Sequence, residues 1–147
     1  MSTVCDWINC CHDKLVKDSS FAALVGGNTL QFEPTIDDRF DIVCYGDKVN
    51  MIFDEAKRLR FFIAEYPLDE RLTELLSSEE IILERGMDKS AIVSSYGEPD
   101  KSAGPRKLPG LVKNGWIQYN LKEGMKLTFS LSHSDPNTVV DVRVSVE

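Results

Sequence analysis

The fold is decided by residues 40–66, which read FDIVCYGDKVNMIFDEAKRLRFFIAEY. Three runs rich in β-branched and aromatic residues, at 40–45, 49–53 and 59–66, are separated by Gly46-Asp47 and by the polar stretch 54–57. Such runs, broken by turn-forming residues, predict antiparallel strands joined by hairpins. Together with a run at 29–33, they predict a β-meander of three or four strands.

The alternation of side chains within these strands predicts which residues face the core. In 59–66 it assigns Leu59, Phe61 and Ile63 to one face, and Arg60, Phe62, Ala64 and Tyr66 to the other. In the last run, 139–146, it assigns the four valines at 140, 142, 144 and 146 to the core and Asp141, Arg143 and Ser145 to solvent. Both faces of 59–66 carry aromatic residues, so we expect one of them to stay exposed for a partner.

Helical periodicity flanks the strands. Apolar residues spaced by three and four, namely Val4, Trp7, Ile8, Cys11 and Leu15, predict an amphipathic helix from about residue 3 to residue 18. Further helices are expected at 20–25, closed by Gly26-Gly27, at 68–85 and at 89–96, closed by Gly97. Strands follow at 116–121, 125–131 and 139–146, whereas the proline- and glycine-rich segment 101–112 predicts an extended loop.

The order helix, short helix, glycine, meander therefore occurs twice. Gly26 aligns with Gly97 at an offset of 71 residues and Phe53 with Phe129 at 76, the longer loop at 101–112 taking up the difference. Chance similarity between short amphipathic strands is the alternative. A unit of about 70 residues buries too little surface to be stable alone. The expected fold is α+β: one domain, 1–147, of two tandem helix-helix-β-meander repeats (about 1–67 and 68–147) that form a largely antiparallel sheet with helices packed on one face.

Composition and charge exclude several classes of protein. The 147 residues are 42% hydrophobic and 28% charged, as in an ordinary soluble domain, and the net charge of −7 disfavours a general nucleic-acid binder. No run approaches the roughly 18 to 20 apolar residues of a membrane span, and the N-terminus lacks the pattern of a secretory signal. Four cysteines without disulfide-like spacing suggest free thiols. We expect a cytoplasmic protein, monomeric or weakly dimeric, with no membrane or nucleic-acid partner.

Catalytic motifs are sparse. The two histidines, His12 and His133, offer few general bases, and His12 beside Cys10 and Cys11 lacks a second ligand pair at metal-site spacing. Gly26-Gly27 follows a helix, the reverse of the strand-to-helix order of a phosphate loop. We therefore expect no enzyme, no metal and no cofactor. A thiol- or metal-dependent hydrolase using Cys11 or His12 is the alternative.

The charges are unevenly distributed along the chain. Residues 33–55 contain seven acids and two bases, 69–84 contain six acids and one base, and 101–126 contain six bases and one acid. Solvated loops around an ordinary sheet are the simpler interpretation. The sharper one is that an acidic edge of the meander docks a basic partner. The residues expected to bind it are Asp37, Asp38, Asp41, Asp47, Asp54 and Glu55, with Phe62, Tyr66 and Trp116 as aromatic anchors.

A family resemblance comes from the second half of the chain. The segment 92–100, IVSSYGEPD, followed by WIQY at 116–119, LTF at 127–129 and a valine-rich last strand, resembles one repeat of the helix-plus-sheet modules of β-lactamase-inhibitor-like proteins and of bacterial toxin-immunity proteins. The resemblance covers about 87–146 well and the first half loosely. It implies a protein that binds and blocks another protein, here a secreted toxin met in the cytoplasm, where nuclease toxins act.

A second resemblance points to type III secretion chaperones, which are small, acidic, cytosolic and dimeric. It rests on the N-terminal helix, on LQFE at 30–33 and on the acidic meander through Phe61-Phe62-Ile63. Those chaperones generally end in a helix, whereas 139–146 predicts a strand. The chaperone, holding an extended effector segment, is therefore the alternative function.

The charge pattern makes one prediction about binding. Reversing the charges of Asp37, Asp38 and Asp41 together should weaken partner binding far more than reversing Glu79, Glu80 and Glu84, because only the first set lies in the meander. Association rates measured at low and high salt test this. Equal effects of the two triple variants would mean that bulk charge alone attracts the partner.

Overall fold

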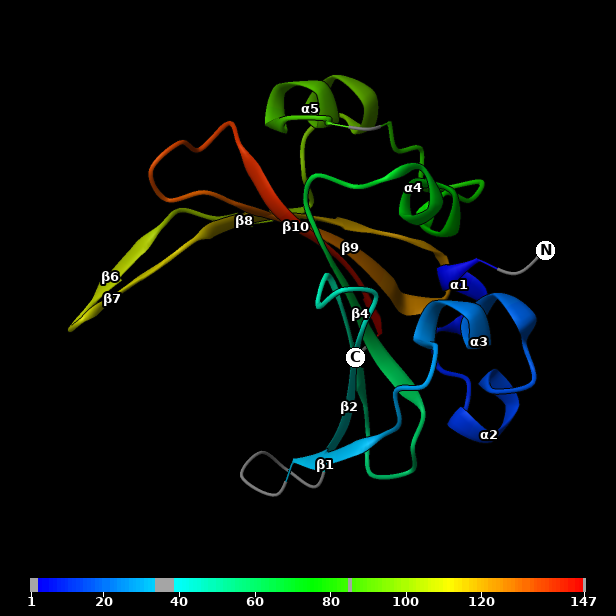
Figure 1. The fold of residues 1–147 in the computed structure, drawn as a ribbon. Helices are drawn as coiled ribbons and strands as arrows, with labels where there is room; N and C mark the ends of the chain where they lie inside the picture. Colours follow the sequence, from blue (N-terminus) through cyan, green and yellow to red (C-terminus); the bar gives the residue numbers. More distant parts are fainter. Residues whose placement is uncertain (1–2, 34–38, 85, 147) are drawn as a thin grey trace.

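The chain forms one large, curved antiparallel sheet with its helices on the convex side (Figure 1). A computed structural model describes residues 3–33, 39–84 and 86–146. Eight strands follow the order β1-β2-β3-β4-β10-β9-β8-β5, and β6 pairs with β7 in a separate two-stranded sheet. The strands are β1 (Gln31–Glu33), β2 (Arg39–Cys44), β3 (Val49–Phe53), β4 (Leu59–Glu65), β5 (Lys101–Ala103), β6 (Arg106–Leu108), β7 (Leu111–Lys113), β8 (Gly115–Asn120), β9 (Met125–Leu131) and β10 (Val139–Val146). The expected α+β class and the antiparallel sheet are confirmed.

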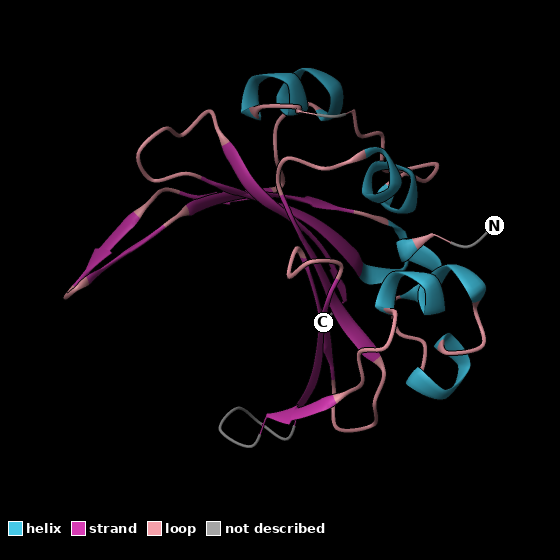
Figure 2. Ribbon diagram, viewed as in Figure 1, coloured by secondary structure: helices cyan, strands magenta, loops and turns pink. Residues whose placement is uncertain are grey.

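The helices are short and lie together on one side of the sheet (Figure 2). They are α1 (Val4–Trp7), α2 (His12–Leu15), α3 (Ser19–Val25), α4 (Glu70–Leu76) and α5 (Lys89–Tyr96), with a 3₁₀ turn, η1 (Lys122–Gly124). An aspartate begins each of the three longer helices: the Asp18, Asp69 and Asp88 carboxylates accept backbone N–H groups of α3, α4 and α5. Such caps satisfy donors that the first helical turn leaves free.

The core lies between the helices and the convex face of the sheet. Trp7 and Phe21 from the helices are buried, and their rings meet edge to face with centroids 5.4 Å apart. Opposite them lie the fully buried sheet residues Phe53, Phe62 and Phe129. This one-sided core leaves the concave face of the sheet without a covering layer.

The single helix expected over residues 3–18 is wrong. Asn9, at φ 68°, separates α1 from α2, and its N–H donates to the Leu59 carbonyl at 2.7 Å. The Leu59 N–H donates in turn to the Cys10 carbonyl, and Cys11 forms a bridge with Arg58. Backbone pairing with the start of β4 therefore overrides the helical periodicity.

The helix expected over 68–85 is also too long, since α4 ends at Leu76. Residues 77–84 then form no helix or strand, and Ile81 and Leu83 among them are buried. This segment is held to α5, because the Tyr96 hydroxyl bonds to both the N–H and the carbonyl of Ile82. Apolar spacing alone could not distinguish this partly buried irregular segment from a helix.

The loop expected over 101–112 contains strands. β5 pairs with β8 at the edge of the main sheet, and β6 and β7 form a hairpin closed by Pro109 and Gly110. Figure 1 shows this hairpin extending away from the sheet. We call residues 106–113 the arm. Gly115 lies where the arm joins β8, and a Cβ there would come within 2.7 Å of the Ala103 carbonyl oxygen.

Two β-bulges change the expected facing of side chains. Between β3 and β4, Ile52 pairs with Phe61 but Phe53 pairs with Leu59, so Arg60 is an extra, unpaired residue. The bulge turns the Leu59 side chain into the core, on the same side as Phe62. In β10, the extra residue is Val140, so that Val139 is buried beside Leu131 instead. Strict alternation therefore misplaced Leu59 and Val140, although Val142 and Val144 are in the core as expected.

The core position of Phe62 gives a stability prediction. Phe62→Ala should lower the free energy of unfolding by about 3–5 kcal/mol, because it leaves a cavity between the sheet and Trp7, whose ring centroid is 6.1 Å away. Phe32→Ala is the matched control, since Phe32 is 52% exposed and should cost less than about 1 kcal/mol. Urea unfolding measures both, and equal losses would contradict the assignment of Phe62 to the core.

Candidate functional site

The concave side of the main sheet lies opposite the helices, and we call it the open face (Figure 2). The strand register places two neighbouring rows of side chains on it. One row is Asp41, Ile52, Phe61, Ser145 and Lys126, and the other is Val43, Asn50, Ile63, Arg143, Thr128 and Gln118. Trp116 lies on the same face opposite Ser130.

Over β2, β3 and β4 the open face carries four apolar side chains, with Asp41 and Asn50 in the same rows. Val43 is 42% exposed, and Ile52, Phe61 and Ile63 are partly exposed beside it. We call these four residues the apolar strip. An antiparallel sheet covered on one face usually carries polar residues on the other. Apolar side chains grouped on such a face are typical of surfaces that bind another molecule.

The open face becomes polar over β10, β9 and β8. A hollow of about 460 Å³ lies there, lined by Phe61, Trp116, Gln118, Thr128, Asp141 and Arg143, with Lys113 contributed by the arm. Gln118 Nε2 donates to Thr128 Oγ1 at 2.9 Å. Arg143 Nε donates to Asp141 Oδ1 at 3.3 Å, and the Arg143 side chain is 42% exposed.

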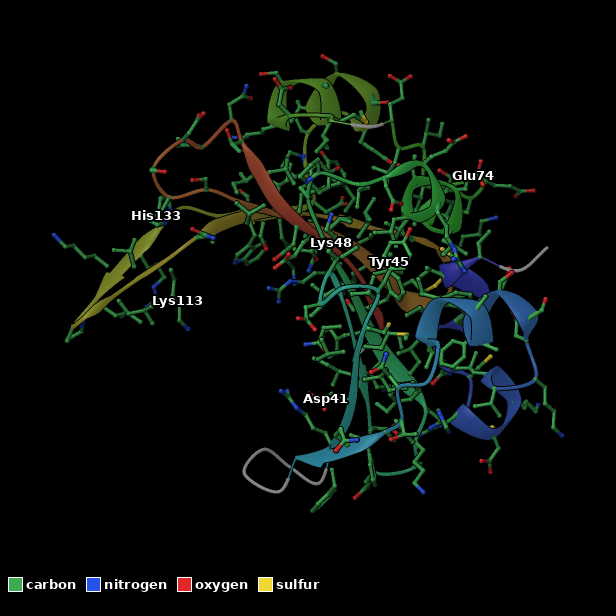
Figure 3. All side chains as sticks on the ribbon, in the orientation of Figure 1. Asp41, Tyr45, Lys48, Glu74, Lys113 and His133 are labelled. Atoms are coloured by element: carbon green, nitrogen blue, oxygen red, sulfur yellow. The ribbon has the colours of Figure 1, made fainter. Side chains whose placement is uncertain are left out.

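The arm adds charge and apolar surface next to this hollow. Leu111 and Val112 are 55% and 39% exposed. Arg106, Lys107 and Lys113 are exposed on the same hairpin. At the base of the arm the Asn114 side-chain oxygen accepts the His133 N–H at 3.1 Å. The arm is therefore a basic projection. In Figure 3, Lys113 marks the arm, which lies at the opposite end of the concave side from Asp41.

The structure brings together only part of the binding set expected from sequence. Asp41 and Trp116 lie on the open face, on opposite halves of the sheet. Asp47 is exposed in the β2–β3 turn, whereas Asp54 and Glu55 lie in the β3–β4 turn, at the other end of β3. Asp37 and Asp38 lie outside the described residues. The described acids therefore surround the β2–β4 meander and do not form one patch.

Asp54 has a structural role in its turn. Its Oδ1 accepts the N–H groups of Ala56 and Arg58, each at 3.0 Å. Its Oδ2 lies 3.4 Å from Arg58 Nε and 3.8 Å from Arg60 Nε. Because two guanidinium groups neutralise this carboxylate, Asp54 contributes little to the electrostatic attraction of a basic partner.

Two of the aromatic anchors expected from sequence lie elsewhere. Phe62 cannot contact a partner, because it is 0% exposed and packs below the sheet against Trp7. Tyr66 comes directly after β4. Its side chain lies on the helix side of the sheet, like those of Phe62 and Ala64, and is half-buried. Its hydroxyl oxygen is buried and has no hydrogen-bond partner among the described residues. Of the three aromatic anchors, only Trp116 lies on the open face.

Arg143, Gln118 and Thr128 were missed as site residues. For Arg143 the sequence did contain a signal, because alternation in 139–146 predicts that its side chain faces solvent. No pattern in the sequence indicates that β10 lies at the centre of the sheet, beside β4. Only that position places Arg143 directly opposite Ile63, at the boundary between the apolar and polar halves.

Of the groups considered for catalysis, His12 is placed for packing, whereas His133 is exposed and Cys11 pairs through its backbone with Arg58. The His12 ring contacts Phe21 and Phe53, with centroids 6.3 and 5.7 Å away, and burial lowers the pKa of His12. All four cysteines are free, and burial raises the pKa of Cys44 to about 11, which disfavours the thiolate. Within 3–33, 39–84 and 86–146, no group of three or more His, Cys, Asp or Glu residues is arranged to hold a metal ion.

Comparisons with known proteins identify no match. No family model, no curated protein and no solved structure matches this chain. In the part of the chain that the structure describes, no helix has the length and apolar character needed to cross a membrane.

The unpaired hydroxyl of Tyr66 gives a prediction about pH. Burial raises the pKa of Tyr66 to about 12, so the folded state keeps a proton that the unfolded chain releases near pH 10, and the stability that Tyr66 supplies is lost as the pH rises from 10 to 12. Tyr66→Phe should leave stability at pH 7 unchanged or higher, and should reduce the loss between pH 9 and pH 11. Urea midpoints at the three pH values measure both effects.

Tyr119→Phe is the control for this substitution. The Tyr119 hydroxyl donates to the Gly97 carbonyl at 2.9 Å, so its removal should cost about 0.5–1.5 kcal/mol at pH 7. A comparable loss in Tyr66→Phe would indicate that the Tyr66 hydroxyl has a partner.

Proposed function

We propose that this chain is an immunity protein, which binds a secreted antibacterial toxin in the cytoplasm and occludes it through the open face. The observation that carries the proposal is the apolar strip, Val43, Ile52, Phe61 and Ile63, on the uncovered side of a sheet whose helices all lie on the other side. Burying such a strip against a partner supplies affinity that an ordinary solvated sheet face lacks.

The charge around the strip favours a basic partner, such as a nuclease domain that binds phosphate. Asp41 lies on the open face, and Asp47 and Glu55 are exposed at the two ends of the neighbouring hairpin. With a net charge of −7, these carboxylates attract a basic domain toward the β1–β4 half of the sheet. Trp116, partly exposed across the open face, provides an aromatic contact of the kind enriched at binding hot spots.

Binding rather than catalysis is the proposed activity. The open face offers a wide surface with one polar hollow, and burial raises the pKa of both the Cys5 and Cys44 thiols away from nucleophilic values. The proposal therefore assigns the protein no cofactor, no metal and no reaction of its own.

A tandem repeat forms part of the proposal. Asp18 and Asp88, 70 residues apart, cap α3 and α5, and both helices end at a glycine with positive φ, Gly26 and Gly97, 71 residues apart. Phe21 and Ile92, 71 residues apart, are both fully buried. Each helix precedes a set of strands that ends in the centre of the sheet, at β4 or β10. A duplicated unit would explain these correspondences.

Affinity capture from the native host tests the proposal. The wild-type chain should retain a secreted protein with a basic toxin domain, and adding the purified chain should abolish that protein's toxicity. Ile52→Lys should weaken binding at least tenfold, about 1.4 kcal/mol, because it places a charge in the apolar strip. Ile82→Lys is the matched control, because Ile82 is 61% exposed and lies outside the main sheet.

Two results would count against an immunity protein. One is the capture of an acidic or membrane protein that Ile52→Lys retains as well as the wild type. The other is a stable dimer in light scattering that holds an extended effector segment, which is the behaviour of a type III secretion chaperone.

A further inference from the structure

The hollow on the open face brings hydrogen-bond donors of Arg143 and Lys113 together with aromatic surface from Phe61 and Trp116. It lies on the central and second-half strands β10, β9 and β8, next to the apolar strip, which shares Phe61 with it. Its volume, about 460 Å³, is that of a pocket that accepts several side chains or a small ligand. Its occupant can be inferred from the charges on its walls.

Arg143 is the principal donor in the hollow. Among the described residues its guanidinium donates one hydrogen bond, from Nε to Asp141 Oδ1, and none from its terminal nitrogens. Asp141 is the more buried partner, with 18% of its side chain exposed against 42% for Arg143. Asp141 therefore orients the guanidinium while its two outer N–H edges stay available.

The rest of the wall favours an anion over a cation. Lys113 from the arm adds a second positive charge, so that two cations face one carboxylate. Phe61 and Trp116 supply apolar surface, which excludes water and strengthens a charge-assisted hydrogen bond once the hollow is covered. A planar carboxylate matches the fork of donors that a guanidinium presents.

We propose that the hollow holds the carboxylate of an Asp or Glu side chain, carried by a loop of the protein that docks on the open face. The inference rests on the open face being the docking surface of the proposed function, and it adds a specificity-determining contact at Arg143. The partner then has two distinct regions: a basic surface toward Asp41 and Asp47, and an acidic loop toward Arg143 and the arm. A nucleic-acid phosphate is the less suitable occupant, because Asp141 and the net charge of −7 oppose an extended polyanion.

A library of disulfide-closed peptide loops displayed on phage tests this assignment. Loops selected on the wild-type protein should share one Asp or Glu beside apolar residues. They should bind Arg143→Gln at least tenfold more weakly, and Arg71→Gln as tightly as the wild type. Arg71 is the matched control because it is exposed on α4, on the helix side of the sheet and outside the hollow.

A change in the peptide checks the result without altering the protein. Replacing the shared Glu by Gln should cause the same tenfold loss on the wild type and no further loss on Arg143→Gln, as expected for one direct contact. Selected loops without an acid, or with equal affinity for Arg143→Gln, would overturn the inference. Displacement of the loops by an oligothymidine strand would also overturn it, in favour of a phosphate site.

The outcomes separate this inference from the proposed function. If the acidic loops depend on Arg143 but no toxin is captured, the carboxylate site stands and the immunity role falls. If a toxin is captured through Ile52 with no effect of Arg143→Gln, the immunity role stands and the carboxylate site is wrong.

Discussion

The structure depends on the pairing of β4 with β10. These strands are the last of the two meanders, and they lie side by side at the centre of the eight-stranded sheet. Ala64 lies opposite Val142 and Phe62 opposite Val144, and all four are fully buried. Because this pairing joins residues far apart in the chain, it makes one continuous core from the two meanders.

The same pairing produces the boundary on the open face. On the side away from the helices, Ile63 lies opposite Arg143 and Phe61 opposite Ser145. The first meander contributes the apolar strip up to this boundary, together with Asp41 and Asn50. The second contributes Trp116 and otherwise mainly hydroxyl, amide and charged groups beyond it. A partner that covers both halves must match an apolar region and a polar one in a fixed orientation, which favours specificity over general adhesion.

β-Bulges and the arm contribute to the concave shape and its edges. A bulge bends a strand and increases its twist, and the extra residues Arg60 and Val140 lie in the two central strands. The arm extends from the polar end of the sheet, and Gly115 permits its close approach to Ala103. These features depend on strand register, so the open face is a property of the assembled sheet and not of one segment.

The sequence by itself determined the α+β class and several local elements. Turn residues and runs of β-branched and aromatic residues located β2, β3 and β4, and terminal glycines located the ends of α3 and α5, because these signals act within a few residues. It also correctly placed Asp41 in the meander and Val142 and Val144 in the core. The acidic binding set was only partly informative, since charge identifies a residue's type and not its neighbours.

Only the tertiary structure decided which strands meet and which face stays uncovered. It divided the N-terminal helix at Asn9, turned Leu59 inward, and buried Phe62, which the sequence had offered as an anchor. It also placed Arg143 beside Ile63 and brought Trp116 and Lys113 to the same hollow. The physical reason is that backbone pairing and burial between distant segments outweigh local conformational preference. In addition, each β-bulge reverses which side chains of a strand face the core, so alternation read from the sequence fails beyond it.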